Sequence, residues 1–143
     1  YGKWDKFDPE KSHMIPAVIR KLYLAKKNND TAEIWGDGTA RREFMYAEDL
    51  ADFIYYSLMN YDQIDSYTNV GVGHDYSILD YYNEVAGIIG FKGQFKFDLT
   101  KPSGMKRKLC SINKQKKLGW KPKHTLKQGL LKTYQFYLEK YEI

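Results

Sequence analysis

The stretch that decides the fold reads Ala32-Glu33-Ile34-Trp35-Gly36-Asp37-Gly38-Thr39-Ala40-Arg41-Arg42-Glu43-Phe44. Its first four residues predict a short strand. The next four, with two glycines and an aspartate, are typical of a tight turn. An extended segment is predicted to follow from Arg41 to Tyr46. This succession puts β structure near the centre of the chain.

Amphipathic helices are predicted on both sides of this stretch. Apolar residues recur at helical spacing from Ile15 to Leu22, and Asn28-Asn29 marks the end of that helix. A second helix is predicted over Glu48–Asn60, with acidic residues in its first turn. The other predicted elements are a strand over Tyr67–Gly71, a helix capped by Ser77 and ended by Gly90, a strand over Gln94–Asp98 with Phe95 and Phe97 inward, a short helix at about 112–118 and a last helix from Thr125 to about Tyr141. The fold class is therefore mixed α/β.

Length and composition exclude several classes of protein. The 143 residues are 43% hydrophobic and carry 23 basic against 18 acidic side chains, a net charge of +5. These values fit one domain with a core and exclude a disordered chain. Met14–Ile19, the longest near-apolar stretch, is too short for a membrane span, and one cysteine excludes a disulfide scaffold. Because the chain opens at Tyr1 without a methionine or a signal peptide, we expect it to be part of a longer protein.

No self-contained catalytic motif is present in the sequence. Gly71-Val72-Gly73 lacks the third glycine of a dinucleotide-binding loop, so a plain turn after a strand is favoured. Cys110 falls in a predicted short strand, where a packing role is favoured over a catalytic thiol. No Cys/His cluster indicates a metal site.

Three histidines are candidates for proton transfer. His13 lies directly before the first predicted helix, where an imidazole is able to exchange protons with a substrate, although its chemistry alone favours a capping or surface role. His74 and His124 lie in polar loops and are predicted to be exposed.

An aromatic residue and several cations suggest an anion site. Trp35 stands at a strand end, Arg41 and Arg42 follow within seven residues, and Lys101–Lys108 is a basic loop. Tryptophan stacks on flat rings, and arginine and lysine pair with phosphates. Together they suit a nucleotide or a nucleotide-sugar, with ordinary solvated loops as an equally good explanation. Nucleic acid is a weaker interpretation, because aromatic residues interleaved with basic ones on a known RNA-binding fold are missing.

Motifs along essentially the whole chain resemble one known family. They are Tyr1-Gly2, Ser12-His13…Ile15-Pro16, Trp35-Gly36…Gly38-Thr39…Arg42-Glu43-Phe44, Asn69-Val70-Gly71, Lys101-Pro102 and Leu118-Gly119-Trp120-Lys121-Pro122. This pattern resembles the GDP-L-fucose synthase family of the extended short-chain dehydrogenase/reductases. The resemblance implies that residues 1–143 are a C-terminal substrate-binding domain with short strands and about five helices. The N-terminal Rossmann part that binds NADP would then lie outside this chain.

The resemblance also implies roles for individual residues. His13 matches a histidine that protonates substrate carbons beside the nicotinamide, and is thus a catalytic and cofactor-binding candidate. The residues that match the GDP-binding side chains of the family are Lys21, Trp35, Arg42 and Lys108. Lys21 replaces a more common arginine and loses its bidentate fork. Lys11, near His13, and Ser103, in place of an aspartate, also depart from the pattern.

The implied activity is epimerisation of GDP-4-keto-6-deoxy-mannose and its reduction by NADPH to GDP-L-fucose. This chain alone is expected to be inactive. The complete enzyme is expected to be a cytoplasmic homodimer that binds neither nucleic acid nor membrane. Two alternatives remain open: a related GDP-hexose or GDP-heptose epimerase or reductase, and a non-catalytic module that binds nucleotide-sugars. The resemblance further implies an incompletely covered apolar face on the helix over Glu48–Asn60.

Overall fold

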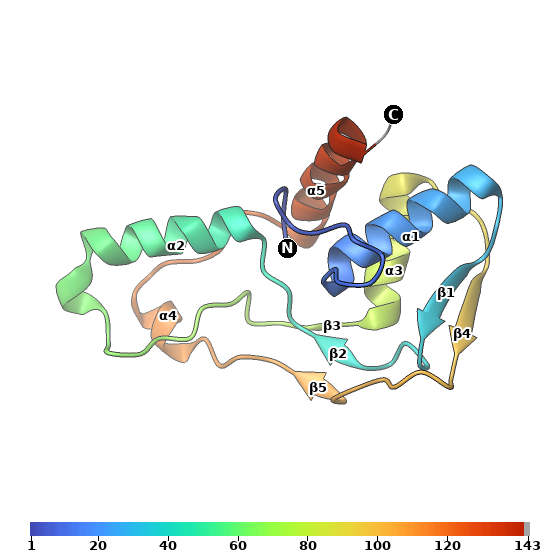
Figure 1. Cartoon of the computed structure of the whole chain (residues 1–143). Helices are drawn as coiled ribbons and strands as arrows, with labels where there is room; N and C mark the ends of the chain where they lie inside the picture. The colour runs from blue at the N-terminus through green and yellow to red at the C-terminus, as the bar shows by residue number, and fades with distance from the viewer. Residues whose placement is uncertain (142–143) are drawn as a thin grey trace.

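Three helices form the core of the molecule. The computed structural model describes residues 1–141 (Figure 1). In it α1 (Met14–Asn28), α3 (Ile78–Ile89) and α5 (Leu126–Tyr141) pack against one another. Helix α1 buries Ile15, Ile19 and Leu22 completely, as its apolar spacing predicts. Most of the buried apolar side chains lie between these three helices and the neighbouring residues of β1.

Two small sheets border this core. Strand β1 (Ala32–Trp35) pairs in parallel with β4 (Phe95–Asp98) and lies against α1. Strand β2 (Arg41–Arg42) lies between β3 (Tyr76–Ser77), which is antiparallel to it, and β5 (Arg107–Lys108), which is parallel. The turn after β1 leads directly from the first sheet into the second (Figure 1). The decisive stretch thus joins both sheets, and the predicted mixed α/β class is confirmed.

Helix α2 (Ala47–Met59) extends away from the three-helix core and is followed by the short 3₁₀ turn η1 (Tyr61–Gln63) (Figure 1). Of its residues only Asp49 and Phe53 are buried. A row of large apolar side chains is exposed on it and beyond it, namely Leu50, Ile54, Tyr55, Leu58, Met59 and Tyr61. The expected incompletely covered apolar face is therefore present.

The helix ends follow the predicted signals closely. Ser77 caps α3 through a capping box with Asp80, and Gly90 ends the helix in the left-handed conformation. Thr125 and Gln128 exchange hydrogen bonds at the start of α5. The short predicted helix is α4 (Asn113–Lys117). Five α-helices are present in residues 1–141, as expected.

Two predictions about strands are wrong. Residues 67–71 form no strand, because Gly71 exchanges both of its backbone hydrogen bonds with the side chain of Gln115 instead of a neighbouring strand. Phe97 is exposed rather than inward. The rings that cover this part of β4, Tyr82 and Phe91, lie against Phe95 and not against Phe97.

None of the helices within residues 1–141 is long and apolar enough to cross a lipid bilayer.

Candidate anion-binding site

Four basic side chains meet where β2 and β5 lie side by side. Arg41 is opposite Arg107 in the register, and Arg42 is opposite Lys108. Successive side chains of a strand point to opposite faces of a sheet. The Arg41–Arg107 pair and the Arg42–Lys108 pair therefore lie on opposite faces.

Asp75 neutralises one of these two pairs. Arg41 Nε donates to Asp75 Oδ1 at 3.0 Å, and Arg107 Nε donates to Oδ2. The Asp75 side chain is only 3% exposed. Its hydrogen bonds from Arg107 and, to a smaller extent, Arg41 hold the pKa of this carboxyl group below its ordinary value. Asp75 thus ties β2 and β5 to the segment that enters β3.

The other pair has no such counter-ion. Arg42 Nη1 donates to the carbonyl oxygen of Arg41 at 2.7 Å, and Lys108 is exposed. Within residues 1–141 neither side chain lies within ion-pair distance of a carboxylate. Two adjacent positive charges therefore remain available to an anion on this face.

Trp35 adds an aromatic surface at the end of β1. Its ring is 56% exposed, and Nε1 donates to Glu33 Oε1 at 2.7 Å. The Lys21 and Lys101 ammonium groups lie 5.6 and 5.5 Å from the ring centroid. Lys21 also donates to the Glu33 carbonyl oxygen at 2.8 Å, and burial lowers its pKa. The tryptophan is thus held in place with two cations beside it.

The loop between β4 and β5 connects Trp35 with the Arg42–Lys108 pair. Gly36 has a φ of +73°, and a Cβ there would lie 3.1 Å from the Cβ of Ser103. Arg42 Nη2 would lie 3.4 Å from a Cβ on Gly104. The contact at Gly36 is tighter than an ordinary van der Waals contact, and the positive φ of Gly36 and Gly104 favours glycine at both positions. We name the surface formed by Lys21, Trp35, Arg42, Lys101 and Lys108 the anion surface.

His13 lies in a different place. It is the N-cap residue of α1, its side chain is 82% exposed, and Nδ1 is 2.9 Å from Asp5 Oδ1. It lines a cavity of about 560 Å³ together with residues 1–5 and the start of α2, and none of Lys21, Trp35, Arg42 and Lys108 lines that cavity. The structure brings Lys21 to Trp35 and Arg42 to Lys108, and leaves His13 apart from both pairs.

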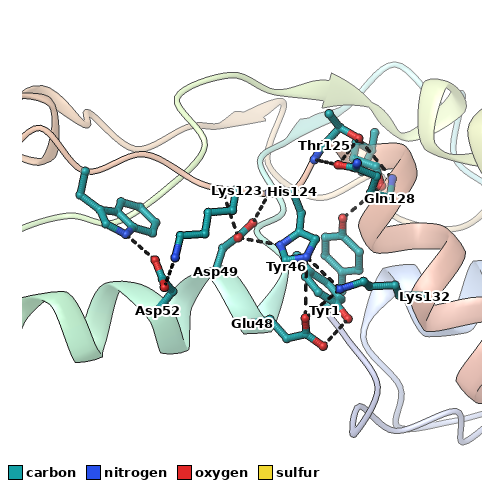
Figure 2. A network of polar contacts seen from close by, with 12 residues as sticks. Tyr1, Tyr46, Glu48, Asp49, Asp52, Lys123, His124, Thr125, Gln128 and Lys132 are labelled. Atoms are coloured by element: carbon teal, nitrogen blue, oxygen red, sulfur yellow. Dashed lines mark hydrogen bonds and ion pairs between the residues drawn. The ribbon is translucent and has the colours of Figure 1, made fainter.

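The prediction that His124 is exposed is wrong. His124 Nδ1 is 2.8 Å from the buried Asp49 Oδ1, and Nε2 is 2.9 Å from Lys132 Nζ (Figure 2). Asp49 also accepts hydrogen bonds from the backbone N–H groups of Lys123 and His124. This network ties the first turn of α2 to the start of α5. The sequence carries no local signal for it, because Asp49 and His124 are 75 residues apart.

Cys110 and the two-glycine turn also have defined positions. Cys110 is exposed, so the expected packing role is wrong; β5 ends at Lys108, before the cysteine.

The backbone N–H groups of the two-glycine segment are both taken by side chains. Gly71 N–H donates to Gln115 Oε1 at 2.9 Å, and Gly73 N–H donates to Glu43 Oε1 at 2.6 Å. A phosphate-binding loop needs free N–H groups. Residues 71–73 therefore form a bend that does not fit the phosphates of NADP, and the strand predicted before it is absent.

Sequence reasoning missed Asp75 and did not single out Lys101 from the basic loop. An aspartate between a histidine and a tyrosine gives no signal for pairing with arginines more than 30 residues away. Among residues 1–141 no group of three or more His, Cys, Asp or Glu side chains is placed to hold a metal ion.

The chain is similar in sequence and structure to several enzymes named for GDP-linked sugars. It is 52% identical over 139 residues to a GDP-L-colitose synthase of Yersinia pseudotuberculosis, covering 96% of this chain and 45% of that protein. It is 46% identical to a GDP-L-fucose synthase of Azorhizobium caulinodans, covering 100% and 46%. The structure of a GDP-mannoheptose C4 reductase from Campylobacter jejuni with NADP bound matches with a TM-score of 0.82, 34% identity and coverage of 96% and 50%.

The chain thus spans about half the length of the curated relatives it matches. The model of the NAD dependent epimerase/dehydratase family matches residues 1–73 of the 143, from the His13 loop through the first two sheet strands to the two-glycine turn. The family match and the relatives agree with the resemblance seen in the motifs, and the chain belongs to the NAD dependent epimerase/dehydratase family.

Proposed function

We propose that residues 1–143 are the substrate-binding, C-terminal part of an enzyme that acts on a GDP-linked sugar. The complete enzyme epimerises GDP-4-keto-6-deoxy-mannose and reduces it to GDP-L-fucose. The observation that carries this proposal is the Arg42–Lys108 pair, which has no carboxylate partner in residues 1–141. The loop at Ser103–Gly104 approaches both Arg42 and Gly36, the residue next to the exposed Trp35. The names of the relatives support a GDP-sugar rather than another phosphate ligand.

Each residue of the anion surface has a physical role in this proposal. Trp35 stacks on the guanine ring, because a flat exposed indole offers a large contact area. Arg42 and Lys108 pair with the diphosphate, where charge-assisted hydrogen bonds are strong. Lys21 contributes positive charge, although its ammonium group already donates to the Glu33 carbonyl oxygen.

The chemistry of the complete enzyme follows from the ketone of the substrate. A ketone acidifies the neighbouring C–H bonds, so a base removes a proton and an acid returns one on the opposite face. His13 is the acid in this half of the enzyme. NADPH supplies the hydride for reduction. We place the part that binds this cofactor outside the chain, which spans about half the length of its relatives, and expect the chain alone to catalyse neither step.

Calorimetric titration of the chain with GDP tests the anion surface. Arg42→Gln should weaken binding about tenfold or more, since a hydrogen bond to a charged group contributes about 1.5–3 kcal/mol. Trp35→Ala should weaken it through lost stacking. The matched control is Lys96→Gln, which removes one charge from an exposed position on β4. Equal affinity of Arg42→Gln and Lys96→Gln would contradict the assignment.

A related GDP-sugar is the second candidate substrate. The relatives include a GDP-L-colitose synthase at 52% identity and a GDP-mannoheptose C4 reductase at 34% identity, and their names refer to different sugars. Lys11 and Ser103 depart from the family pattern, and we propose that they affect which sugar is accepted. A panel of GDP-linked 4-keto sugars offered to the complete enzyme decides between the candidates: turnover of another sugar without fucose product selects the second.

Two other classes of function are tested by turnover and by the salt dependence of binding. A non-catalytic module would bind nucleotide-sugars with the same anion surface, yet the complete protein would turn none of them over. Binding to random RNA with steep salt dependence would instead favour the weaker nucleic-acid interpretation. We also propose a cytoplasmic homodimer for the complete enzyme, which light scattering and cell fractionation check.

A further inference from the structure

The His13 side chain has a single hydrogen-bonding partner of opposite charge. Its Nδ1 lies 2.9 Å from Asp5 Oδ1, and within residues 1–141 no second side chain forms an ion pair with the ring. His13 occupies the N-cap position of α1, but its side chain makes no capping hydrogen bond. The ring is therefore turned toward the loop before α1 and not back onto the helix.

Asp5 is well placed to hold that ring. Its side chain is 13% exposed, against 82% for His13. Asp5 Oδ1 also accepts the backbone N–H of Lys6 at 2.8 Å, and Asp5 N–H donates to the Gly2 carbonyl oxygen at 3.3 Å. The carboxylate is thus fixed by its own loop, while the imidazole is free apart from this one contact. A fixed acceptor beside an exposed ring favours the tautomer that carries the proton on the nitrogen facing that acceptor.

The second ring nitrogen borders on open space. Asp5 and His13 both line the cavity of about 560 Å³ between the N-terminal loop and the start of α2. With Nδ1–H donating to Asp5, Nε2 is the nitrogen left for a ligand in that cavity. Nδ1 is therefore held by Asp5, and Nε2 is left to react.

We propose that Asp5 is a positioning residue that holds the proton of His13 on Nδ1 and leaves Nε2 for proton transfer to the substrate. Its catalytic consequence rests on the proposed function. In that reaction the imidazolium gives its Nε2 proton to the substrate carbanion, a C–H bond forms, and His13 becomes a neutral imidazole whose Nδ1–H still donates to Asp5. The carboxylate stays ionised throughout, as an orienting group does.

Nitrogen-15 NMR of the His13 ring in the 143-residue chain tests the positioning without any activity. At a pH where the ring is neutral, the wild type should show mainly the Nδ1–H tautomer. Asp5→Ala should move the ring toward the Nε2–H tautomer, because the anchoring acceptor is gone. The matched control is Asp8→Ala, which removes a carboxylate of the same loop that caps the Glu10 and Lys11 N–H groups and does not contact His13.

Several outcomes overturn the inference. A wild-type ring that is mainly Nε2–H overturns it even if Asp5→Ala fails to fold. An Asp5→Ala tautomer equal to that of the wild type overturns it as well, and so does an equal shift in Asp8→Ala. A shift of the tautomer in Asp5→Ala and not in Asp8→Ala supports the inference. If Asp5 only stabilised the loop, its removal would leave the tautomer of the His13 ring unchanged.

Kinetics of the complete enzyme then separate this inference from the proposed function. Asp5→Ala should lower kcat about tenfold or more for epimerisation with little change in KM, because an acid in the wrong tautomer loses its contribution to the chemical step. If the tautomer shifts and kcat does not, Asp5 positions His13 as inferred, but His13 is not the acid. That result would overturn the proposed role of His13 and leave the positioning intact.

Discussion

Helices α1 and α2 are similar in length and differ in how they are held. Helix α1 has 15 residues and buries Ile15, Pro16, Val18, Ile19, Leu22 and Ala25 against α3 and α5. Helix α2 has 13 residues, is rich in large apolar side chains, and buries only Asp49 and Phe53. Apolar composition therefore does not decide which helix joins the core. The presence of a packing partner does.

Polar contacts supplement a small apolar contact at α2, that of Phe53 with Trp120. The buried Asp49 carboxylate accepts hydrogen bonds from the N–H groups of Lys123 and His124, and Asp52 accepts from Trp120 Nε1 at 2.8 Å and from Lys123 Nζ (Figure 2). Two carboxylates one turn apart thus hold the helix to the segment before α5. A region held by burial and a region held by charged hydrogen bonds should respond differently to mutation and to pH.

The largest effect is expected in the helical core. Leu22 is fully buried, so Leu22→Ala loses its transfer free energy and leaves a cavity, at a cost of about 2–5 kcal/mol of unfolding free energy. Leu58→Ala, on the 69% exposed Leu58 of α2, is the matched control and should change stability by less than about 0.5 kcal/mol. Urea unfolding measures both. Similar losses in the two variants would mean that α2 is packed as firmly as α1.

A smaller and more local effect is expected at Asp49. Asp49→Asn turns one acceptor oxygen into an NH₂ group that faces donors, which leaves buried N–H groups unsatisfied at a cost of about 1–3 kcal/mol. Amide hydrogen exchange should speed up in α2 and at Lys123 and His124, while α1 and α3 keep their protection. Asp62→Asn removes an exposed carboxylate in η1 and serves as control. Faster exchange throughout the core would show that α2 unfolds together with it.

The same comparison explains what the sequence predicted and what it did not. Helix positions followed from apolar spacing and from caps such as Ser77 and Gly90, which act over one or two turns. The residues 67–71 were misjudged because a side chain, Gln115, takes the hydrogen bonds that a neighbouring strand would have taken. Local sequence patterns therefore predict where helices begin and end better than they predict which distant residues form hydrogen bonds with each other.

In the candidate site too, residue types could be predicted from the sequence and long-range contacts could not. Trp35, Arg42 and the basic loop were found because residue type alone indicates stacking and phosphate binding. The difference between the two basic pairs could not be predicted, since it depends on the pairing of Asp75 with Arg41 and Arg107 on one face of the sheet. The partly buried position of His124 could not be predicted either, because its partner Asp49 is distant in sequence. Contacts between charged groups far apart in the chain carry no periodic signal.

The smallest effect is expected from acid, and it should reach α2 before the core. Hydrogen bonds from Lys123 and then Trp120 hold the pKa of Asp52 below its ordinary value. A carboxyl group with a lowered pKa in the folded state contributes stability above its ordinary pKa of about 4, and that contribution is lost as the pH falls through the lowered value. Acid should therefore lower the amide protection factors of α2, measured against the intrinsic exchange rate at each pH, before those of α1, since the apolar contacts of α1 with α3 and α5 involve no carboxylate.

Asp52→Asn provides the test of that pH dependence. The variant keeps a similar shape but no longer titrates, so part of the change in α2 exchange below about pH 4 should disappear, while exchange in α1 stays the same as in the wild type. The remainder should come from Glu48, whose pKa is lowered chiefly by its hydrogen bond from Lys132. Loss of protection in α1 at the same pH as in α2 would contradict the division, because it would mean that carboxylates hold the helical core together as well.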